Sequence, residues 1–349
     1  MFAQAHYDRH GYVVTYAWVC RKDQDVVVTL PSSIRATSAT QLDKVVVVEG
    51  SSSIQVNTIN TGSCGAYMAL PVDAFGTEYV VSTWAPRADR NPPEESFYGV
   101  IAPEADTTLT ITTLGVTRTE TIAQAFGSFS VTSQTDLSGT VISADKPIGV
   151  LSGNPDTQLL DTNSATDYLI SYLWPTQYWG SQHVVPAIPG VTAPYSIKIT
   201  ASVFTEVRIY GDSYFAVQAG GFVLKTMSSN RAYYIESSAA IQVVQYAPQE
   251  VTAASFSAPA SIIIPSVARY ASDVFFMTPQ QTGTFTHYVT VTIAREHVTG
   301  LLLDTQPLQV PDVDDIPRID ENTDLVTITF TVSVSPHPWN HWACTAGGS

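Results

Sequence analysis

The chain has 349 residues, of which 44% are hydrophobic and only 13% are charged, with 16 basic residues against 31 acidic ones. This length allows two or three domains with buried cores, and the formal net charge of −15 disfavours nucleic acid and anionic membrane surfaces as partners. No run of about 18 apolar residues predicts a membrane helix, and the first residues lack the apolar core of a signal peptide, so we expect a trimmed segment of a secreted protein or an intracellular chain.

The chain begins with a mixed polar stretch, residues 1–25, in which residues 10–19 predict one strand with alternating faces. After it, short runs rich in valine, threonine and isoleucine follow one another closely, separated by polar turns. No stretch longer than about three helical turns shows a helical repeat of apolar residues. The sequence therefore predicts an all-β protein.

An internal repeat organises the chain. Its first half is a β-run, a polar turn and a second β-run, found as EGSSSIQV at 49–56, SADKPIGV at 143–150 and ESSAAIQV at 236–243. The matching isoleucines are Ile54, Ile148 and Ile241, which lie 94 and 93 residues apart. We expect these three side chains to be buried at equivalent positions.

The second half of the repeat is a proline, an aromatic or glycine step and a new strand, at 70–81, 174–185 and 264–276. A period near 93 residues is too long for a solenoid, whose repeats run to about 50 residues, and is close to the roughly 100 residues of one immunoglobulin-sized sandwich. The sequence thus predicts tandem β-sandwich units. The predicted division is an N-terminal arm or strand at 1–25, sandwich repeats at 26–105, 106–204 and 205–298, and a partial fourth unit and tail at 299–349.

Three groups of residues are candidates for special roles. The cysteines Cys20, Cys64 and Cys344 are odd in number, so they are either three buried thiols or one disulfide, with Cys20 to Cys64 favoured because both lie in the first repeat. An acidic loop supplies carboxylates of the kind that calcium binds, at Asp312, Asp314, Asp315 and Asp320, although the EF-hand spacing is missing and a solvated loop is the simpler interpretation. The aromatic residues Trp84, Trp174, Tyr178 and Trp179 either bind a sugar or protein partner or cap a sandwich core.

No pattern in the sequence indicates catalysis. The G-x-S-x-G elbow that exposes a nucleophilic serine is absent, although paired carboxylates for glycoside hydrolysis are not excluded by sequence. The sequence therefore favours a protein that is not an enzyme. No cofactor is expected unless the acidic loop binds calcium.

Three ordered runs carry a resemblance to a known family. They are ALPVDAFGTEYVV at 69–81, LSGTVISADKPIGVLSGN at 137–154 and LWPTQYWGSQHVVPAIPG at 173–190, and together they resemble the IgGFc-binding domain family. The resemblance implies an extracellular, non-enzymatic protein of mucus, secretions or adhesive surfaces. The cysteine pair that relatives often carry is missing from residues 154–172, and von Willebrand type D signatures are absent, so disulfide-linked assembly through that module is not implied.

We therefore expect an extracellular binding or scaffold protein that acts in adhesion, mucus, matrix or a surface filament through the loops and edge strands of its β-domains. A carbohydrate-binding or carbohydrate-processing β protein is the alternative. The expected partners are other extracellular proteins or glycoproteins, without nucleic acid or membrane insertion. Head-to-tail self-assembly would follow if residues 11–19 completed the C-terminal sheet of the next chain, whereas the simpler alternative pairs them within their own first domain.

Overall fold

The structure is a computed structural model that describes residues 2–9, 12–19, 26–30, 41–42, 45–60, 65–87, 94–159, 166–249, 258–277, 286–332 and 339–344. Over these residues the regular structure is almost entirely antiparallel β, and the helical segments are 3₁₀ turns of three to six residues. The all-β prediction is therefore confirmed. None of the described helices is long and apolar enough to cross a membrane.

Seven strands form a first sandwich. They are β7 (Gly76–Val80), β8 (Ser96–Ala102), β9 (Thr107–Thr113), β10 (Val116–Ile122), β11 (Gly127–Ser133), β12 (Val141–Thr157) and β13 (Asp167–Tyr172). One layer has the order β10-β9-β12-β7, and the other has the order β11-β8-β12-β13. The short strand β3 (Gln41–Leu42) adds to β11 at the edge of the second layer.

The long strand β12 belongs to both layers. Its first residues, Val141 to Ala144, pair with β9, and residues 149–153 pair with β8 in the opposite layer. The pairing with β7 shifts register between Ser143 and Ile148, which marks an irregularity where the strand turns from one layer into the other. The polar turn expected in SADKPIGV is therefore a bend within one continuous strand, a correction to the sequence interpretation.

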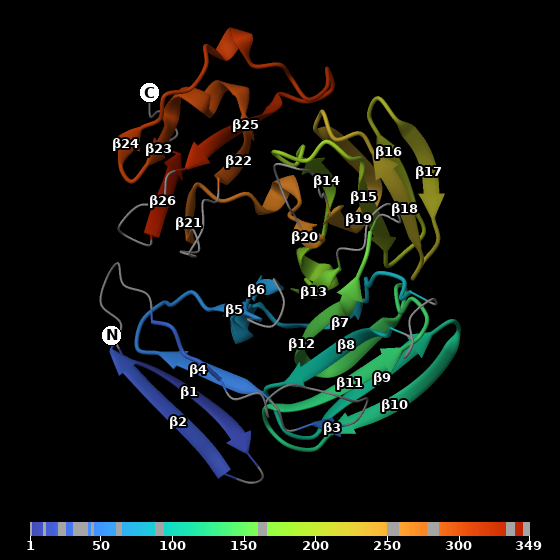
Figure 1. The fold of residues 1–349 in the computed structure, drawn as a ribbon. Coiled ribbons are helices and arrows are strands. Elements are labelled where there is room, and N and C mark those ends of the chain that lie inside the picture. The colour runs from blue at the N-terminus through green and yellow to red at the C-terminus, as the bar shows by residue number, and fades with distance from the viewer. Residues whose placement is uncertain are drawn as a thin grey trace.

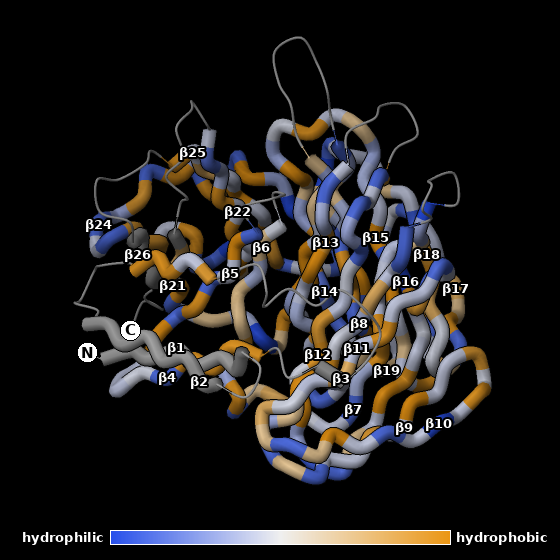
Figure 2. The backbone as a smooth tube through the Cα atoms, turned by 60° about the horizontal axis from the view of Figure 1, so that its bottom comes forward, coloured by the Kyte–Doolittle hydropathy of each residue, from blue (hydrophilic) through white to orange (hydrophobic). Residues whose placement is uncertain are grey.

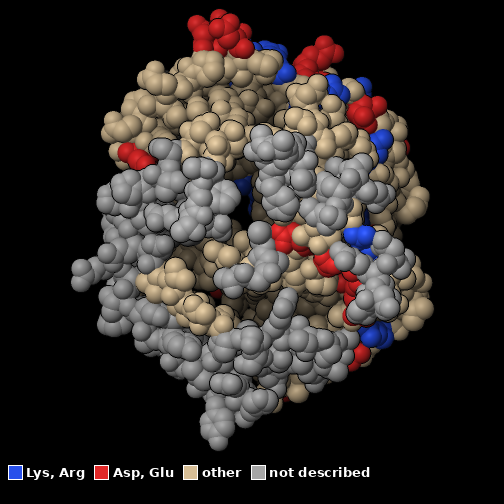
Figure 3. Space-filling model, in the orientation of Figure 1, with Lys and Arg blue, Asp and Glu red and all other residues tan. Residues whose placement is uncertain are grey.

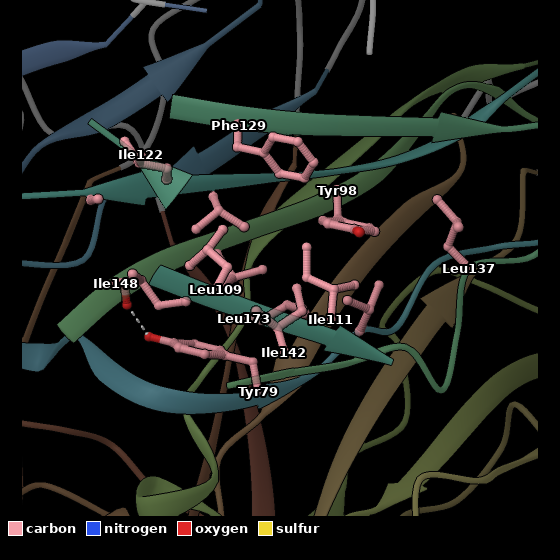
Figure 4. Packing of buried hydrophobic residues seen from close by; sticks show 14 residues of the cluster. Tyr79, Tyr98, Leu109, Ile111, Ile122, Phe129, Leu137, Ile142, Ile148 and Leu173 are labelled. Atoms are coloured by element: carbon pink, nitrogen blue, oxygen red, sulfur yellow. Dashed lines mark hydrogen bonds between the residues drawn. The ribbon is translucent and has the colours of Figure 1, made fainter. Parts of the chain in front are cut away.

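Apolar side chains from both layers meet in one core. Strand β8 alternates between buried and half-buried residues along its whole length, as a strand with one face against a core does. Tyr79, Tyr98 and Leu109 are almost fully buried there, and Figure 4 shows them converging from different strands. The hydroxyl of Tyr79 donates a hydrogen bond to the Ile148 carbonyl at 2.5 Å and accepts one from the Gly76 N–H at 3.1 Å. This phenol therefore ties β7 to the bend of β12.

A second sandwich repeats the first strand for strand. It contains β14 (Gly180–Val185), β15 (Tyr195–Ala201), β16 (Thr205–Ile209), β17 (Ser213–Val217), β18 (Phe222–Met227), β19 (Tyr233–Ala247) and β20 (Ala260–Ile264). Its layers are β17-β16-β19-β14 and β18-β15-β19-β20, so β19 bends as β12 does. In Figure 2 hydrophobic and hydrophilic residues alternate along many of these strands. The predicted internal repeat is confirmed by this shared topology.

The marker isoleucines agree with the repeat in two of three cases. Ile148 faces Gly76 and Ile241 faces Gly180, and both isoleucines are fully buried at equivalent points of the two long strands. Ile54 is only half-buried and lies between strands, so the prediction of its burial is wrong. The physical reason is that, among the described residues, no hydrophobic cluster forms around it.

In each sandwich the first strand begins with a glycine, and this glycine contacts the segment that follows the last strand. A Cβ atom on Gly76 would lie 2.4 Å from the Cβ of Pro175, and one on Gly180 would lie 2.5 Å from the Cβ of Ser266. Real Cβ atoms do not approach so closely, so the absence of a side chain permits both contacts. The seven strands of the first sandwich span residues 76–172, and those of the second span residues 180–264. The domain boundaries expected near residues 105 and 204 therefore fall inside the sandwiches, between β8 and β9 and between β15 and β16.

Further strands flank the two sandwiches, which lie one above the other on the right of Figure 1. The N-terminal sheet has the order β2 (Tyr12–Val19), β1 (Phe2–Arg9), β4 (Val46–Gly50), and β5 (Asn57–Ile59) pairs with β6 (Ala66–Met68). Strand β2 pairs with β1 over its whole length, so residues 12–19 follow the intrachain alternative.

The C-terminal strands form part of another copy of the repeat. They are β21 (Asp273–Met277), β22 (His287–Ala294), β23 (Leu301–Leu303), β24 (Gln306–Pro307), β25 (Leu325–Val332) and β26 (Trp339–Cys344). Strand β26 pairs with β21 and β23, and β22 pairs with β25, as β19 pairs with β14 and β16, and β15 with β18. These strands, from β21 to β26, thus share the repeat's strand pairing, whereas the partial unit expected at 299–349 would begin only after β21 and β22.

Candidate functional site

The junction between the two sandwiches is built around Lys198 on β15. Ile197 and Ile199 point into the core of the second sandwich, so the alternation of a strand turns Lys198 outward. The first sandwich covers it there, and only 1% of the residue is exposed. A lysine is almost never buried without partners, so hydrogen-bond acceptors are expected around its ammonium group.

Three acceptors from the first sandwich surround that ammonium group. The Lys198 Nζ atom donates to the Thr83 carbonyl at 2.5 Å, to Asp136 Oδ2 at 2.9 Å and to the Ser138 hydroxyl at 2.8 Å. The rings of Phe222 and Trp84 lie 4.5 Å and 5.9 Å from the same nitrogen. An ammonium group has three N–H donors, so each donor has an acceptor, and two π-faces add cation–π attraction.

Asp136 is held in place by its own hydrogen bonds. It accepts from the Thr83 hydroxyl at 2.7 Å, from the Ser138 N–H at 3.0 Å and from the Ser138 hydroxyl at 2.6 Å. Burial alone raises the pKa of Asp136, but Lys198 and these hydrogen bonds outweigh burial and hold the pKa below its usual range. Burial lowers the pKa of Lys198, and Asp136 opposes that effect. The pair therefore joins the two sandwiches as a buried ionic contact.

A pocket opens beside this ion pair, between β12 and β13 of one sandwich and β19 and β20 of the other. Its aromatic wall is formed by Trp84 and Tyr246, whose ring centroids are 4.8 Å apart. Burial raises the pKa of Tyr246, and its hydroxyl lies 3.4 Å from the Thr83 carbonyl. Four serine residues complete the polar part of the lining, namely Ser82, Ser152, Ser171 and Ser261. The enclosed cavity is only about 20 Å³, room for about one water molecule, so a partner would contact this site at the mouth of the pocket.

The four aromatic residues predicted from sequence lie in two places. Trp84 lines the junction pocket, whereas the other three lie in or next to the 3₁₀ turn η3 (Thr176–Tyr178). There the Trp179 indole N–H donates to the Trp174 carbonyl at 2.9 Å, and Trp179 is 7% exposed. Tyr178 lies under the Arg269 guanidinium at 5.1 Å. Their role in binding stays a prediction.

The acidic residues lie on and near η6 (Val313–Asp315), and Figure 3 shows acidic side chains gathered at this end of the molecule. The Asp312 carboxylate accepts from the Asp314 N–H at 3.1 Å, and Asp314 receives an Arg295 contact at 3.4 Å. The Asp320 carboxylate accepts a hydrogen bond from the Asn322 N–H at 3.0 Å. Asp315 is the last residue of η6. Within the described ranges no three His, Cys, Asp or Glu residues are grouped to hold a metal ion. Calcium binding stays a prediction.

The cysteine predictions fall largely outside the described residues. Cys20 and Cys64 are not among them, and only the backbone of Cys344, at the end of β26, is described. The pairing of these cysteines therefore stays a prediction.

The sequence reasoning missed the ion pair at the junction. Lys198 and Asp136 are 62 residues apart, and no motif links them. One signal was available: Lys198 is the only Lys, Arg, Asp or Glu between Asp167 and Glu206. A single charge in so long an uncharged stretch indicates a specific partner, although it does not identify that partner.

Comparisons with known proteins agree with the resemblance noted in the sequence. A family model described as IgGFc binding protein matches residues 65–347. The human IgGFc-binding protein is 25% identical over 271 residues, which is 72% of this chain but 5% of the human protein, so the chain spans about a twentieth of that relative. No solved structure matches the chain. Because the family model covers most of the chain, the protein belongs to the IgGFc-binding protein family.

Proposed function

We propose that this chain is an extracellular, non-enzymatic binding domain that recognises a protein partner at the junction of its two sandwiches. The observation that carries the proposal is the pocket beside Trp84, which combines an aromatic wall with serine hydroxyls. Aromatic residues in pockets dominate binding energy at protein interfaces, and hydroxyl groups fix the orientation of what enters. Membership of a family named for binding supports the same reading.

The chemistry of the lining supports binding over catalysis. A serine nucleophile needs an adjacent base, and the described residues that line this pocket include no histidine, cysteine or carboxylate. The Ser152 hydroxyl donates instead to the Ser82 carbonyl at 2.7 Å. This hydrogen bond links β12 to the segment that follows β7.

The name of the human relative suggests the Fc region of immunoglobulin G as a first candidate partner. More broadly, we propose action in mucus, an adhesive matrix or a surface filament, with secretion, disulfide formation and self-assembly as parts of that proposal. A surface displaying many such domains would gain affinity through multivalency.

The test is binding of the full chain to immobilised human Fc, measured by biolayer interferometry. Ser261 lies opposite Tyr246 across β19 and β20, so Ser261→Trp covers the mouth of the pocket without removing a core side chain. We expect this variant to lose at least tenfold in affinity. The control Thr119→Trp adds the same bulk at an exposed position on β10 and should bind as the unmodified chain does.

Two outcomes separate the parts of the proposal. If the unmodified chain does not bind Fc at about 100 μM, Fc is the wrong partner. If the chain and Ser261→Trp bind equally well, the pocket is not the binding site.

A further inference from the structure

One face of the second sandwich carries a row of side chains that crosses four strands. Arg208 on β16 lies directly opposite Tyr214 on β17 and opposite Glu236 on β19, and Glu236 lies opposite Gln182 on β14. The neighbours Val207 and Ile209 point into the core, so this row faces outward. At about 4.8 Å between strands, the row is about 14 Å long.

The first sandwich provides an internal comparison. The equivalent row there consists of Thr119, Thr110, Ser143 and Glu78, by the same strand pairing. The fold therefore forms the same four-strand layer with small hydroxyl side chains where the second sandwich has tyrosine, arginine and glutamate. Since folding does not require these larger groups, their presence in one copy points to a role specific to that copy.

The carboxylate of the row is fixed in position. Glu236 accepts hydrogen bonds from the hydroxyls of Tyr210 at 2.5 Å and Tyr234 at 2.9 Å, and from Gln182 Nε2 at 3.1 Å. The rings of Tyr210 and Tyr234 stack at 5.3 Å, and the Arg208 guanidinium lies 4.6 Å from the Tyr210 ring. The hydrogen bond from Tyr210, and with it those from Tyr234 and Gln182, lowers the pKa of Glu236 despite opposing burial. The acceptor is thus charged and immobile before any ligand arrives.

The rest of the row is open to solvent. The Tyr214 side chain is 65% exposed, and Arg208 and Gln182 are exposed as well. A hydrogen bond with Glu206 raises the pKa of Tyr214, and this contact orients the ring. The row therefore presents a ring face, a guanidinium, a carboxylate and an amide in line on a flat sheet.

We propose that this row is a binding site for a neutral oligosaccharide. A sugar offers an apolar C–H face that stacks on an aromatic ring and paired hydroxyls that donate to a carboxylate and accept from arginine or an amide, which are the groups present here. Two carboxylates, Glu206 and Glu236, flank the single cation Arg208, so the site disfavours sialylated or sulfated sugars. This site lies apart from the junction pocket and does not depend on the protein-binding proposal.

The experiment applies the full chain to a printed array of neutral oligosaccharides built from galactose, glucose, mannose or N-acetylglucosamine, with sialylated and sulfated forms beside them. The best neutral binder is then titrated calorimetrically against variants. Arg208→Thr with Glu236→Ser imports the residues of the first sandwich and should reduce affinity more than tenfold. Tyr214→Thr should reduce it about tenfold, because stacking needs the ring. Tyr214→Phe keeps the ring but loses the contact with Glu206, so it should reduce affinity less than Tyr214→Thr does.

Controls keep the result interpretable. Thr110→Val with Ser143→Ala alters the equivalent row of the first sandwich and should leave binding unchanged, as should the pocket variant Ser261→Trp. Circular dichroism and melting temperature establish that each variant is folded. The proposal is overturned if no neutral sugar binds, if only charged sugars bind, or if the folded Arg208→Thr, Glu236→Ser variant binds as the unmodified chain does.

Discussion

Replacing Lys198 by methionine tests the ionic contact between the sandwiches. Methionine keeps most of the apolar stem but removes the charge, leaving Asp136, Ser138 and the Thr83 carbonyl without their common donor. Breaking a fully buried ion pair typically costs about 3–5 kcal/mol. The Lys198 side chain is 2% exposed but that of Asp136 is 22% exposed, so the carboxylate regains some water. We therefore expect a loss near the lower end, about 3 kcal/mol.

The assay is urea unfolding followed by tryptophan fluorescence, since Trp84 lies 5.9 Å from the Lys198 ammonium and reports on the junction. The variants Lys198→Met, Asp136→Asn and their combination form a double-mutant cycle. The combined variant should recover about 1–2 kcal/mol relative to the sum of the single losses, because it leaves neither charge unpaired. A loss below about 0.5 kcal/mol in Lys198→Met, or strict additivity in the cycle, would refute the account of the junction.

Three further predictions follow from buried groups. Burial lowers the pKa of His183 to about 4, so as the pH falls the unfolded chain, in which this pKa is near 6.5, takes up the proton first. About 3 kcal/mol of stability should therefore be lost between pH 6.5 and 4. His183→Gln should lose less stability than the unmodified chain when urea midpoints are compared across that range. Gly76→Ala should cost about 1–3 kcal/mol in thermal unfolding, because its Cβ meets Pro175, whereas Gly99→Ala, whose Cβ meets nothing within 4 Å, should not destabilise the protein. Tyr79→Phe should cost about 1–2 kcal/mol, because two buried backbone groups lose their partner.

Each of these has an outcome that contradicts it. An unchanged acid slope in His183→Gln would mean that other groups cause the loss. Equal effects of the two glycine substitutions would argue against the close contact at residue 76. A neutral Tyr79→Phe would mean that water replaces the phenol in this core.

The repeat could be read from sequence because it depends on local pattern. Ile148 and Ile241 recur with the same flanking residues, and their burial follows from the alternation of apolar residues along a strand. The bend in β12 could not be read in this way, since polar residues such as Asp145 and Lys146 resemble a turn between two strands. Here they lie where the strand leaves one layer for the other, and the Lys146 ammonium contacts the Asp106 carbonyl across the sheet.

The junction was beyond sequence reasoning for a different reason. From sequence alone Trp84 could be an exposed residue that anchors a partner. Its actual surroundings depend on Tyr246, 162 residues later, and on how the two sandwiches pack together. Lys198 occupies an outward position that is ordinarily solvated, and only the docking of the first sandwich buries it. Pairings between distant surfaces leave little trace in a single sequence, so the fold was more predictable than the site.

The bend of β12 has a mechanical consequence. Since one continuous strand supplies hydrogen-bonded neighbours to both layers, neither layer can peel away under tension without extracting a strand from the other. The same holds for β19 in the second sandwich. Under tension each of these two sandwiches would either keep its shape or unfold as a whole. Single-molecule pulling would then record two extensions of comparable size for them.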